Sequence, residues 1–393
     1  MGRHYAQPVQ RRSQSTNRGA CMWISVVRRS ALVVFALLLP GSLVAQRYHR
    51  TDLTVDMQAV SPSAPNVDSN VVNAWGLSRG SGSPWWISDN GTGVSTLHNA
   101  AGVPFVPLSG TQPVVVKIPT PDGTGTSAPT GTVFNASTGF LVGPSAKAIF
   151  LFVTEDGTIA GWNPGVNPDA VIVKNRAGKA VYKGCAIAQV NGGPRFYATN
   201  FVSGRVEVFD SSFNQLQSGD AGAFHFPGLG KNWSPFNIQN VGGNLIVSFA
   251  HRAPGSRDED HGAGLGFVGV FDPNGRLLFR LQHGDWFNAP WGAAAAPGDF
   301  GRFSHRLLIG NFGDGTIHAF NLFTGEHEGM MLDDTTGQGM VIDGLWAISF
   351  GGGNASNNGP TNTLFFTAGP NGEGDGLFGQ LTANAADQPG NSQ

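Results

Sequence analysis

The sequence Asn-Ala-Trp-Gly-Leu-Ser at residues 73–78, followed by Trp-Ile-Ser-Asp-Asn-Gly at residues 86–91, is the first copy of a repeated pattern. Weaker copies of its two halves lie further along the chain, at 153–157, 198–201, 288–292, 309–313 and 343–349. A unit repeated at such a period cannot bury its own apolar face, so the copies must pack on one another. The repeat therefore indicates one architecture built from stacked, similar units.

The length of the repeat predicts the kind of unit. Six equivalent positions, which we call the marks of the repeat, can be aligned. They are 55, 53, 53, 55 and 55 residues apart: Trp75, Thr130, Lys183, Phe236, Trp291 and Trp346. A period of about fifty residues, interpreted as four short strands joined by turns, is typical of a propeller blade. We therefore predict an all-β fold, a six-bladed β-propeller.

The two ends of the repeat region predict how the ring closes. Residues 48–55 alternate as a strand before the first full blade, whereas the last blade is one strand short and ends near Leu381. The N-terminal strand is therefore expected to complete the last blade, which would remove exposed sheet edges.

The composition agrees with a compact β protein and excludes some classes of partner. The 393 residues include 57 Gly and 24 Pro, which disfavours long helices and favours strands joined by tight turns. The formal net charge is −2 without a basic stripe, so nucleic acid is not an expected partner.

The N-terminus has the features of a secretory signal. Arg28 and Arg29 precede an apolar run at 31–39, and small residues lead up to a cleavage site after Ala45. Met22 is an alternative start of the chain. The apolar run is too short to span a bilayer, so no membrane span is expected after cleavage. The signal predicts export to the periplasm or the extracellular space.

The expected domain organisation is simple. Residues 1–45 form the signal peptide, residues 46–383 form a single propeller, and residues 384–393 form a flexible tail. Cys185 is then the one cysteine of the exported chain, and we expect it to be a small core residue. The propeller is expected to be a monomer.

Polar residues recur at two places in the repeat that should meet in space. In a propeller, the loop entering the innermost strand and the loop leaving the second strand open on the same face. The entering positions carry Asn73, Lys183, Asn288 and Asp343, and the leaving positions carry Asp89, Glu155, Asn200 and Asn311. We call this predicted side of the ring the polar face.

Two interpretations of these residues remain open. Carboxylate and amide oxygens suit Ca²⁺ or another divalent cation, with Glu155, Asn200, Asn311 and Asp343 as candidate metal ligands. Asn73, Asp89, Lys183 and Asn288 are then candidate ligand-binding residues in a concave site. Alternatively, Asn and Asp at strand ends bond neighbouring backbone in Asx turns around a water-filled channel.

A charged loop at 251–261 is expected to overhang the polar face, because it replaces the tight turn of the fourth blade. It is either a solvated loop or a lid in which His251, Asp260 or His261 has an acid/base or metal role. Asp343, His251 and His261 are the catalytic candidates.

Several segments resemble known families: residues 73–78, 86–97, 154–165, 234–240 and 342–346. They resemble an uncharacterised group of exported bacterial β-propeller proteins, some of which carry an exosortase-type C-terminal sorting tail that this chain lacks. Residues 199–201 and 205–210 are more distantly similar to the six-bladed NHL, gluconolactonase and strictosidine-synthase-like propellers. Asp343-Gly344-Leu345 looks like the turn that supplies a metal ligand in the lactonases, although Asn73 stands where their pattern has Glu.

Three functional hypotheses follow. The first is an exported scaffold that binds a small molecule, glycan or protein at the polar face, with a possible axial cation. The second is a metal-dependent lactone or ester hydrolase, in which the cation would polarise a carbonyl and activate water. The third is a purely structural cell-surface protein.

Overall fold

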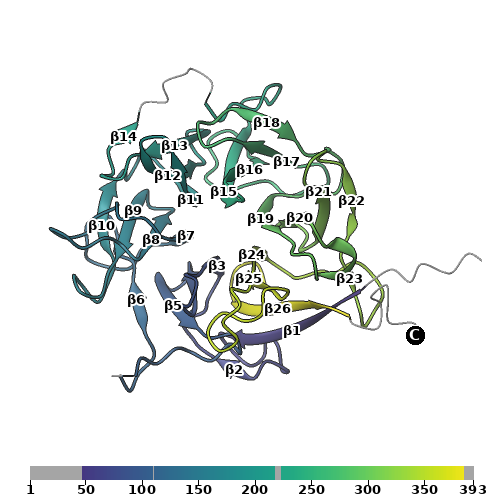
Figure 1. The fold of residues 1–393 in the computed structure, drawn as a ribbon, viewed down its shortest axis with the longest axis horizontal. Helices are drawn as coiled ribbons and strands as arrows, with labels where there is room; N and C mark the ends of the chain where they lie inside the picture. The colour runs from purple at the N-terminus through teal and green to yellow at the C-terminus, as the bar shows by residue number, and fades with distance from the viewer. Residues whose placement is uncertain (1–46, 109, 217–222, 385–393) are drawn as a thin grey trace, which may run out of the picture. The chain divides into compact units, whose positions relative to one another are not determined.

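The computed structural model describes residues 47–108, 110–216 and 223–384, and it shows six sheets arranged as the blades of a ring (Figure 1). The predicted six-bladed propeller is confirmed. The predicted signal peptide and nearly all of the predicted tail lie outside the described residues, so both stay predictions.

The strands of each blade run in chain order from the axis outward. Blade 1 contains β3 (Ala74–Ser78), β4 (Trp85–Asp89), β5 (Val94–His98) and β6 (Val115–Lys117); blade 2 contains β7 (Pro129–Phe134), β8 (Phe150–Thr154), β9 (Thr158–Trp162) and β10 (Val171–Asn175). Blade 3 contains β11 (Tyr182–Val190), β12 (Gly193–Asn200), β13 (Arg205–Phe209) and β14 (Gln215–Leu216); blade 4 contains β15 (Trp233–Val241), β16 (Asn244–His251), β17 (Gly266–Phe271) and β18 (Leu277–Arg280). Blade 5 contains β19 (Pro290–Ala295), β20 (Arg306–Asn311), β21 (Ile317–Asn321) and β22 (His327–Met330). All six marks of the sequence repeat therefore lie in innermost strands.

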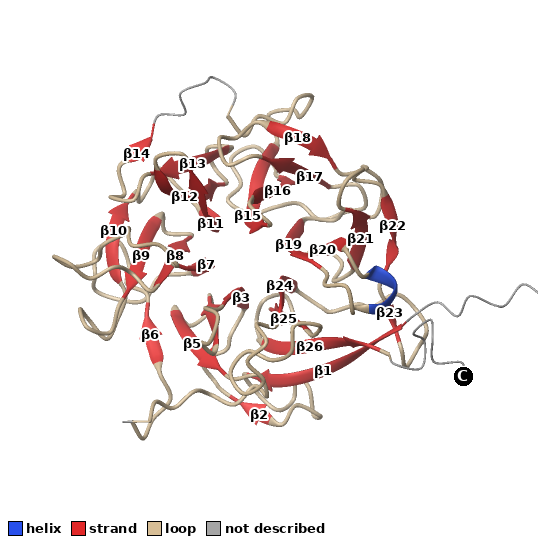
Figure 2. Ribbon diagram, in the orientation of Figure 1, coloured by secondary structure: helices blue, strands red, loops and turns tan. Residues whose placement is uncertain are grey.

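The sixth blade joins the two ends of the described chain. It contains β24 (Leu345–Phe350), β25 (Leu364–Ala368) and β26 (Leu377–Ala383), and β1 (Arg47–Val55) pairs antiparallel with β26. Two short strands, β2 (Asn66–Val67) and β23 (Leu332–Asp333), pair with β1 in parallel. The predicted closure by the N-terminal strand is confirmed. Figure 2 shows the strands together with the short 3₁₀ turn η1 (Gly301–Phe303).

Glycine follows the mark in four of the six innermost strands because these strands approach one another closely. A Cβ atom on Gly76 would lie 2.3 Å from the carbonyl oxygen of Thr130, and one on Gly131 would lie 2.7 Å from the backbone nitrogen of Cys185. Both separations are far below van der Waals contact, so a larger residue would push neighbouring blades apart.

Three tryptophans from equivalent positions fill the axis. Trp75 and Trp346 stack with their ring centroids 3.6 Å apart, and Trp291 contacts them edge-on at 6.4 and 6.0 Å. Phe312 stacks on the other side of Trp346 at 3.7 Å. We call Trp75, Trp291 and Trp346 the aromatic plug. A water-filled channel is therefore wrong at this level of the axis, because indole rings occupy it.

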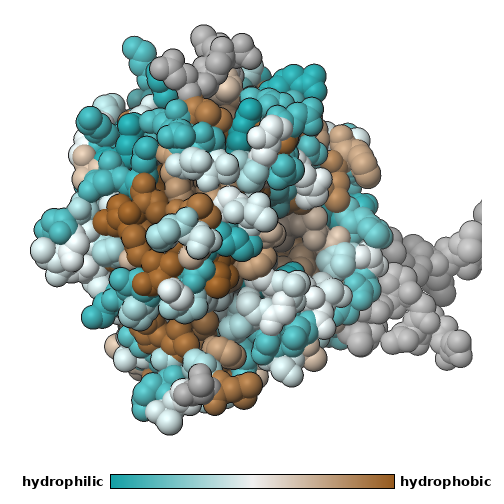
Figure 3. Space-filling view, turned by 60° about the vertical axis from the view of Figure 1, so that its left-hand side comes forward, coloured by the Kyte–Doolittle hydropathy of each residue, from teal (hydrophilic) through white to brown (hydrophobic). Residues whose placement is uncertain are grey.

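The outer surface is mixed in polarity. Figure 3 brings forward the side of the ring that carries β9 and β10, where apolar patches lie between polar side chains. Exposed large apolar residues of blades 1 and 2 include Val106, Leu108, Leu141 and Val166. Of the helical segments in the described residues, none has the length and apolar character needed to cross a bilayer.

We expect ring closure to depend on Tyr48 in β1. Its side chain is fully buried, its ring centroid lies 4.9 Å from that of Phe300, and its hydroxyl donates to the Phe300 carbonyl at 3.1 Å. Tyr48→Ala should lower the free energy of unfolding by about 3–5 kcal/mol, as for other buried aromatic truncations. Urea unfolding measures this effect. Tyr48→Phe should cost about 1 kcal/mol, and a loss below that value for Tyr48→Ala would contradict the dependence.

We expect a second stability effect in blade 5 that depends on pH. His318 Nδ1 and His327 Nε2 lie 2.9 Å apart between β21 and β22. Burial, together with repulsion from His327, lowers the pKa of His318 to about 4, although Asp314 acts in the opposite direction. Burial also lowers the pKa of His327. The unfolded chain binds protons near pH 6.5 and the folded chain does not, so stability present above that pH is lost as pH falls toward 4.

The loss from His318 alone should be on the order of 3 kcal/mol. Urea unfolding between pH 7 and pH 4 measures it, with His318→Leu as the comparison. The variant should have a shallower pH dependence than the natural chain, and parallel curves for the two proteins would refute the assignment.

Candidate functional site

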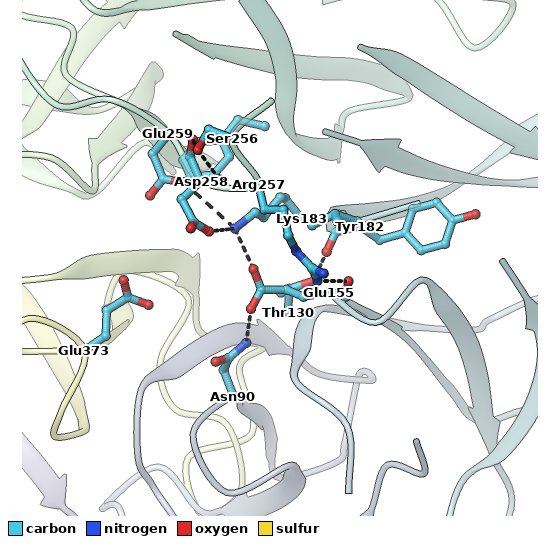
Figure 4. A network of polar contacts seen from close by, with 12 residues as sticks. Asn90, Thr130, Glu155, Tyr182, Lys183, Ser256, Arg257, Asp258, Glu259 and Glu373 are labelled. Carbon is cyan, nitrogen blue, oxygen red and sulfur yellow. Dashed lines mark hydrogen bonds and ion pairs between the residues drawn. The ribbon is translucent and has the colours of Figure 1, made fainter. Parts of the chain in front are cut away.

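Lys183 lies at the centre of the polar face, where a cation had been expected. Its side chain is 2% exposed, and its Nζ lies 2.6 Å from Glu155 Oε1, 3.3 Å from Asp258 Oδ1 and 3.9 Å from Glu259 Oε2. Figure 4 shows Lys183 between Glu155 and Asp258. The ammonium group also lies 5.1 Å from the centroid of the Trp75 ring, a favourable cation–π contact. The lysine therefore connects the polar face to the aromatic plug.

The charge of Lys183 is stabilised by its neighbours. Burial by itself lowers the pKa of the ammonium group, but Glu155, Glu259 and Asp258 outweigh burial and raise the pKa above its ordinary value. Lys183 is thus a permanent cation at neutral pH.

A chain of hydrogen bonds extends from this ion pair to the plug. Asn90 Nδ2 donates to Glu155 Oε2 at 3.1 Å, and Asn73 Nδ2 donates to Asn90 Oδ1 at 3.3 Å. The same Asn73 amide donates to Glu373 Oε2 at 2.6 Å, and Trp346 Nε1 donates to Asn73 Oδ1 at 2.8 Å. Asn73 has a φ of 47°, a left-handed conformation that Asn tolerates better than most residues. Loops of blades 1, 2 and 6 are therefore joined above the plug.

Two further carboxylates belong to this cluster. Burial raises the pKa of Glu373, and the nearby negative charges of Glu259 and Glu155 add to the increase. The Glu259 side chain is 5% exposed, and its Oε2 accepts no hydrogen bond within the described residues. Its Oε1 lies 3.6 Å from His261 Nε2, and this contact raises the pKa of His261.

The loop that connects β16 to β17 overhangs the polar face, as predicted. Arg257 Nη2 donates to the Glu155 carbonyl at 2.8 Å, which ties this loop of blade 4 to blade 2. At its base, His251 Nδ1 lies 2.7 Å from Asp260 Oδ2, and the Gly262 nitrogen donates to Asn288 Oδ1 at 2.8 Å. His251 and Asn288 therefore hold the loop in place.

Several predicted site residues do not reach this cluster. Asn200 Oδ1 accepts from the backbone nitrogens of Val181 and Ser203, both at 3.3 Å, so it helps to form the turn after β12. Asn311 Oδ1 accepts from the Asn288 nitrogen at 3.2 Å, just before β19 begins. Both oxygens therefore bond backbone of their own blade, although the Asn311 contact is not an Asx turn.

Asp89 and Asp343 are also placed away from the ion pair. Asp89 is fully buried inside blade 1, where its Oδ2 accepts from the Thr96 nitrogen at 2.9 Å, and burial raises its pKa well above the ordinary value. Asp343 Oδ2 accepts from the Asn371 nitrogen at 2.9 Å and so supports the loop that carries Glu373. Asp343 thus acts through the loop and does not face Lys183 directly.

The four candidate metal ligands are consequently not assembled as expected. Glu155 joins Lys183, whereas Asn200, Asn311 and Asp343 each accept a hydrogen bond from a backbone nitrogen of their own blade. Within the part of the chain that the structure describes, no group of three or more His, Cys, Asp or Glu side chains is arranged to hold a metal ion. The divalent cation and the hydrolase activity stay predictions.

Sequence reasoning missed three members of the cluster. Asn90 belongs to an Asn-Gly turn directly after β4 and was not among the candidates. Glu373 lies in the loop between β25 and β26, which is longer than the equivalent turns of blades 1, 2, 3 and 5. Glu259 lies in the charged loop, but sequence position did not distinguish it from its acidic neighbours. Only the structure distinguishes Glu259, because it is the acid of that loop whose carboxylate is buried beside Lys183.

The fold and site together define a six-bladed propeller with a closed, charged axial cluster. No protein-family model matches the chain. An uncharacterized protein of Acanthamoeba polyphaga mimivirus is 29% identical over 331 residues, which is 81% of this chain and 76% of that protein. The bacterial origin implied by the sequence resemblance therefore stays a prediction.

Two solved structures share the fold. One is the PQQ-bound form of aldose sugar dehydrogenase from Streptomyces coelicolor, with a TM-score of 0.50 and 13% identity, covering 87% of this chain and 99% of that chain. The other is a protein of unknown function from Bacteroides thetaiotaomicron, with a TM-score of 0.50 and 9% identity, covering 86% of this chain and 77% of that chain. At these identities the likeness extends to the fold alone.

We expect the cluster to depend on the charge of Lys183. Lys183→Met should lower the free energy of unfolding by about 3–5 kcal/mol, because it removes the ammonium partner of the half-buried Glu155 and the buried Glu259. Urea unfolding at pH 7 measures the loss. The double variant Lys183→Met with Glu155→Gln should recover part of the lost stability. Strictly additive effects in this double-mutant cycle would contradict direct coupling of the two residues.

Proposed function

We propose that this protein is a binding propeller that captures a positively charged ligand at its polar face. The observation that carries the proposal is Glu259, a buried carboxylate whose Oε2 has no hydrogen-bond partner in the described residues. Around it the acids outnumber the full cations: the acids are Glu155, Asp156, Asp258, Glu259, Asp260 and Glu373, and the full cations are Lys183, Arg252 and Arg257. A cationic group would offset this excess of negative charge.

A cavity that Glu155 lines, and that Glu259 does not, supports a ligand whose apolar part lies in the cavity while its charged group reaches the acidic cluster. The cavity has a volume of about 450 Å³, and its polar walls are Glu155, Asp156 and Arg257. Its apolar walls include Val181 and Val202. Pockets of this kind bind ligands through apolar walls and a few placed polar groups. The chemistry favours an ammonium group attached to a short apolar body.

The Arg257 contact gives the loop between β16 and β17 a role in this binding. The loop reaches Glu155 through Arg257 and Lys183 through Asp258, and Arg257 forms part of the cavity wall. The proposal includes export of the mature chain, which the N-terminal sequence predicts. It treats a divalent cation as an alternative occupant of the same acidic site.

Calorimetric titration of the full chain with butylammonium chloride, at fixed ionic strength, tests the proposal. We expect saturable binding of butylammonium and no comparable binding of 1-butanol, its neutral analogue. Glu259→Gln should weaken butylammonium binding by about tenfold, because a charge-assisted contact contributes roughly 1.5–3 kcal/mol. Titration with calcium chloride tests the cation, which should compete with butylammonium if both use the acidic site.

The matched control is Asp299→Asn, which removes an exposed carboxylate from the loop between β19 and β20. This variant should bind butylammonium as the natural chain does. Equal binding of 1-butanol, or an unchanged affinity in Glu259→Gln, would refute the proposed function.

A further inference from the structure

The opposite end of the axis contains a second cavity, and its chemistry differs from that of the polar face. The cavity has a volume of about 250 Å³ and is lined by residues from the innermost strands of all six blades. Several of its lining residues lie in or just after the C-terminal halves of these strands, and these include Ser78, Arg79, Thr132, Gln239 and Ser349. Asn73 and Lys183, in contrast, lie at the beginnings of the equivalent strands.

The aromatic plug separates this cavity from the polar face. Trp291 lines the cavity, and its Nε1 donates to the Lys183 carbonyl at 3.1 Å. The stacked rings of Trp75 and Trp346 pack against Trp291. A molecule bound at this end therefore meets a different set of groups from one bound beside Glu155.

Arg79 gives the cavity a positive charge without a matching acid. Among the described residues that line the cavity, Arg79 is the one with a charged side chain. Its Nε and Nη2 donate to the Phe350 carbonyl at 3.0 and 2.8 Å, and Nη2 also donates to the Gly351 carbonyl at 2.9 Å. These neutral acceptors fix the guanidinium between blades 1 and 6, where it also lies 5.5 Å from the centroid of the Trp85 ring, and no carboxylate in the described residues pairs with it. Burial lowers the pKa of Arg79, and no nearby carboxylate opposes this shift.

The remaining polar groups can donate hydrogen bonds. The Gln239 and Ser349 side chains are half-buried, and neither forms a side-chain hydrogen bond within the described residues. Thr132 is 8% exposed, and its Oγ1 is likewise without a partner there. Hydroxyl and amide donors next to a guanidinium suit an oxygen-rich anion, since hydrogen bonds to charged groups are stronger than those to neutral ones.

We propose that this end of the axis is a second binding site, which takes a small oxyanion: a carboxylate, phosphate or sulfate group. The occupant is small, because the volume holds about eight waters at roughly 30 Å³ each. Arg79 supplies the countercharge, while Gln239 and Ser349 supply neutral donors. The site is independent of the proposed binding of cations at the polar face.

Titration of the full chain with sodium acetate, phosphate and sulfate tests this proposal. The measurement is calorimetric, with chloride replaced so that ionic strength stays constant. We expect at least one of the three anions to bind saturably. Comparing the affinity for acetate with the affinities for phosphate and sulfate shows whether the site prefers a planar or a tetrahedral group. Arg79→Met should weaken that binding by about tenfold or more, as expected for the loss of a charge-assisted contact.

Two further variants keep the result interpretable. Gln239→Leu combined with Ser349→Ala removes neutral donors that make no hydrogen bonds within the described residues, so it tests the site if Arg79→Met does not fold. We expect this pair to weaken binding severalfold. Arg195→Met is the matched control, because Arg195 lies in β12 outside the cavity and donates to Asn274. The proposal is overturned if none of the three anions binds saturably, or if the Arg79 and Gln239/Ser349 variants bind like Arg195→Met.

Discussion

The close approach of six innermost strands to one axis is the constraint on which the rest of the structure depends. A ring of six sheets leaves a central space, and protein interiors tolerate few voids. Here that space is filled by the indoles of Trp75, Trp291 and Trp346. The other three marks are Thr130, Lys183 and Phe236, so indoles from three blades share the axis with smaller or more flexible side chains from the remaining three. Glycines beside several marks then allow the backbones to approach.

The filled axis determines the electrostatics above it. Aromatic rings beneath Lys183 exclude water, and charges interact more strongly where water is excluded. The lysine is therefore tightly coupled to carboxylates that come from blade 2 and from the loop of blade 4. Asn73 connects the same network to Glu373 of blade 6. The network at the polar face therefore joins side chains from blades 1, 2, 3 and 6 and from the loop of blade 4.

The sequence predicted the architecture well because the repeat reports it directly. Six marks at nearly constant spacing require six units, and a missing last strand requires the first strand to replace it. Positional reasoning also identified Asn73, Glu155 and Lys183, since loops at equivalent places in a propeller share one face.

The same reasoning could not decide how each side chain would be used. Asn73 and Asn200 are the same residue type, and both were expected at the polar face. The Asn73 amide donates to Glu373 and Asn90, whereas the Asn200 oxygen accepts from backbone nitrogens of its own blade. That choice depends on the local backbone and rotamer, which the repeat does not encode. Glu373 lies in a loop that is longer than the equivalent turns of blades 1, 2, 3 and 5, so those copies have no position that corresponds to it. Lys183 was grouped with the ligand-binding residues, and only the structure shows that its ammonium group is buried beside Glu155 and Glu259.

Closure by β1 has a consequence for the order in which the chain can fold. Tyr48 pairs with Ala383, so β1 depends on a partner 335 positions later in the chain. Pairings this distant carry a large loop-closure entropy and form slowly. Blades 1 to 5 each form their strand ladder from one continuous segment, whereas blade 6 needs segments from both ends of the described chain. Until β26 forms, β1 is a strand without its antiparallel neighbour, which is an exposed edge for wrong pairing.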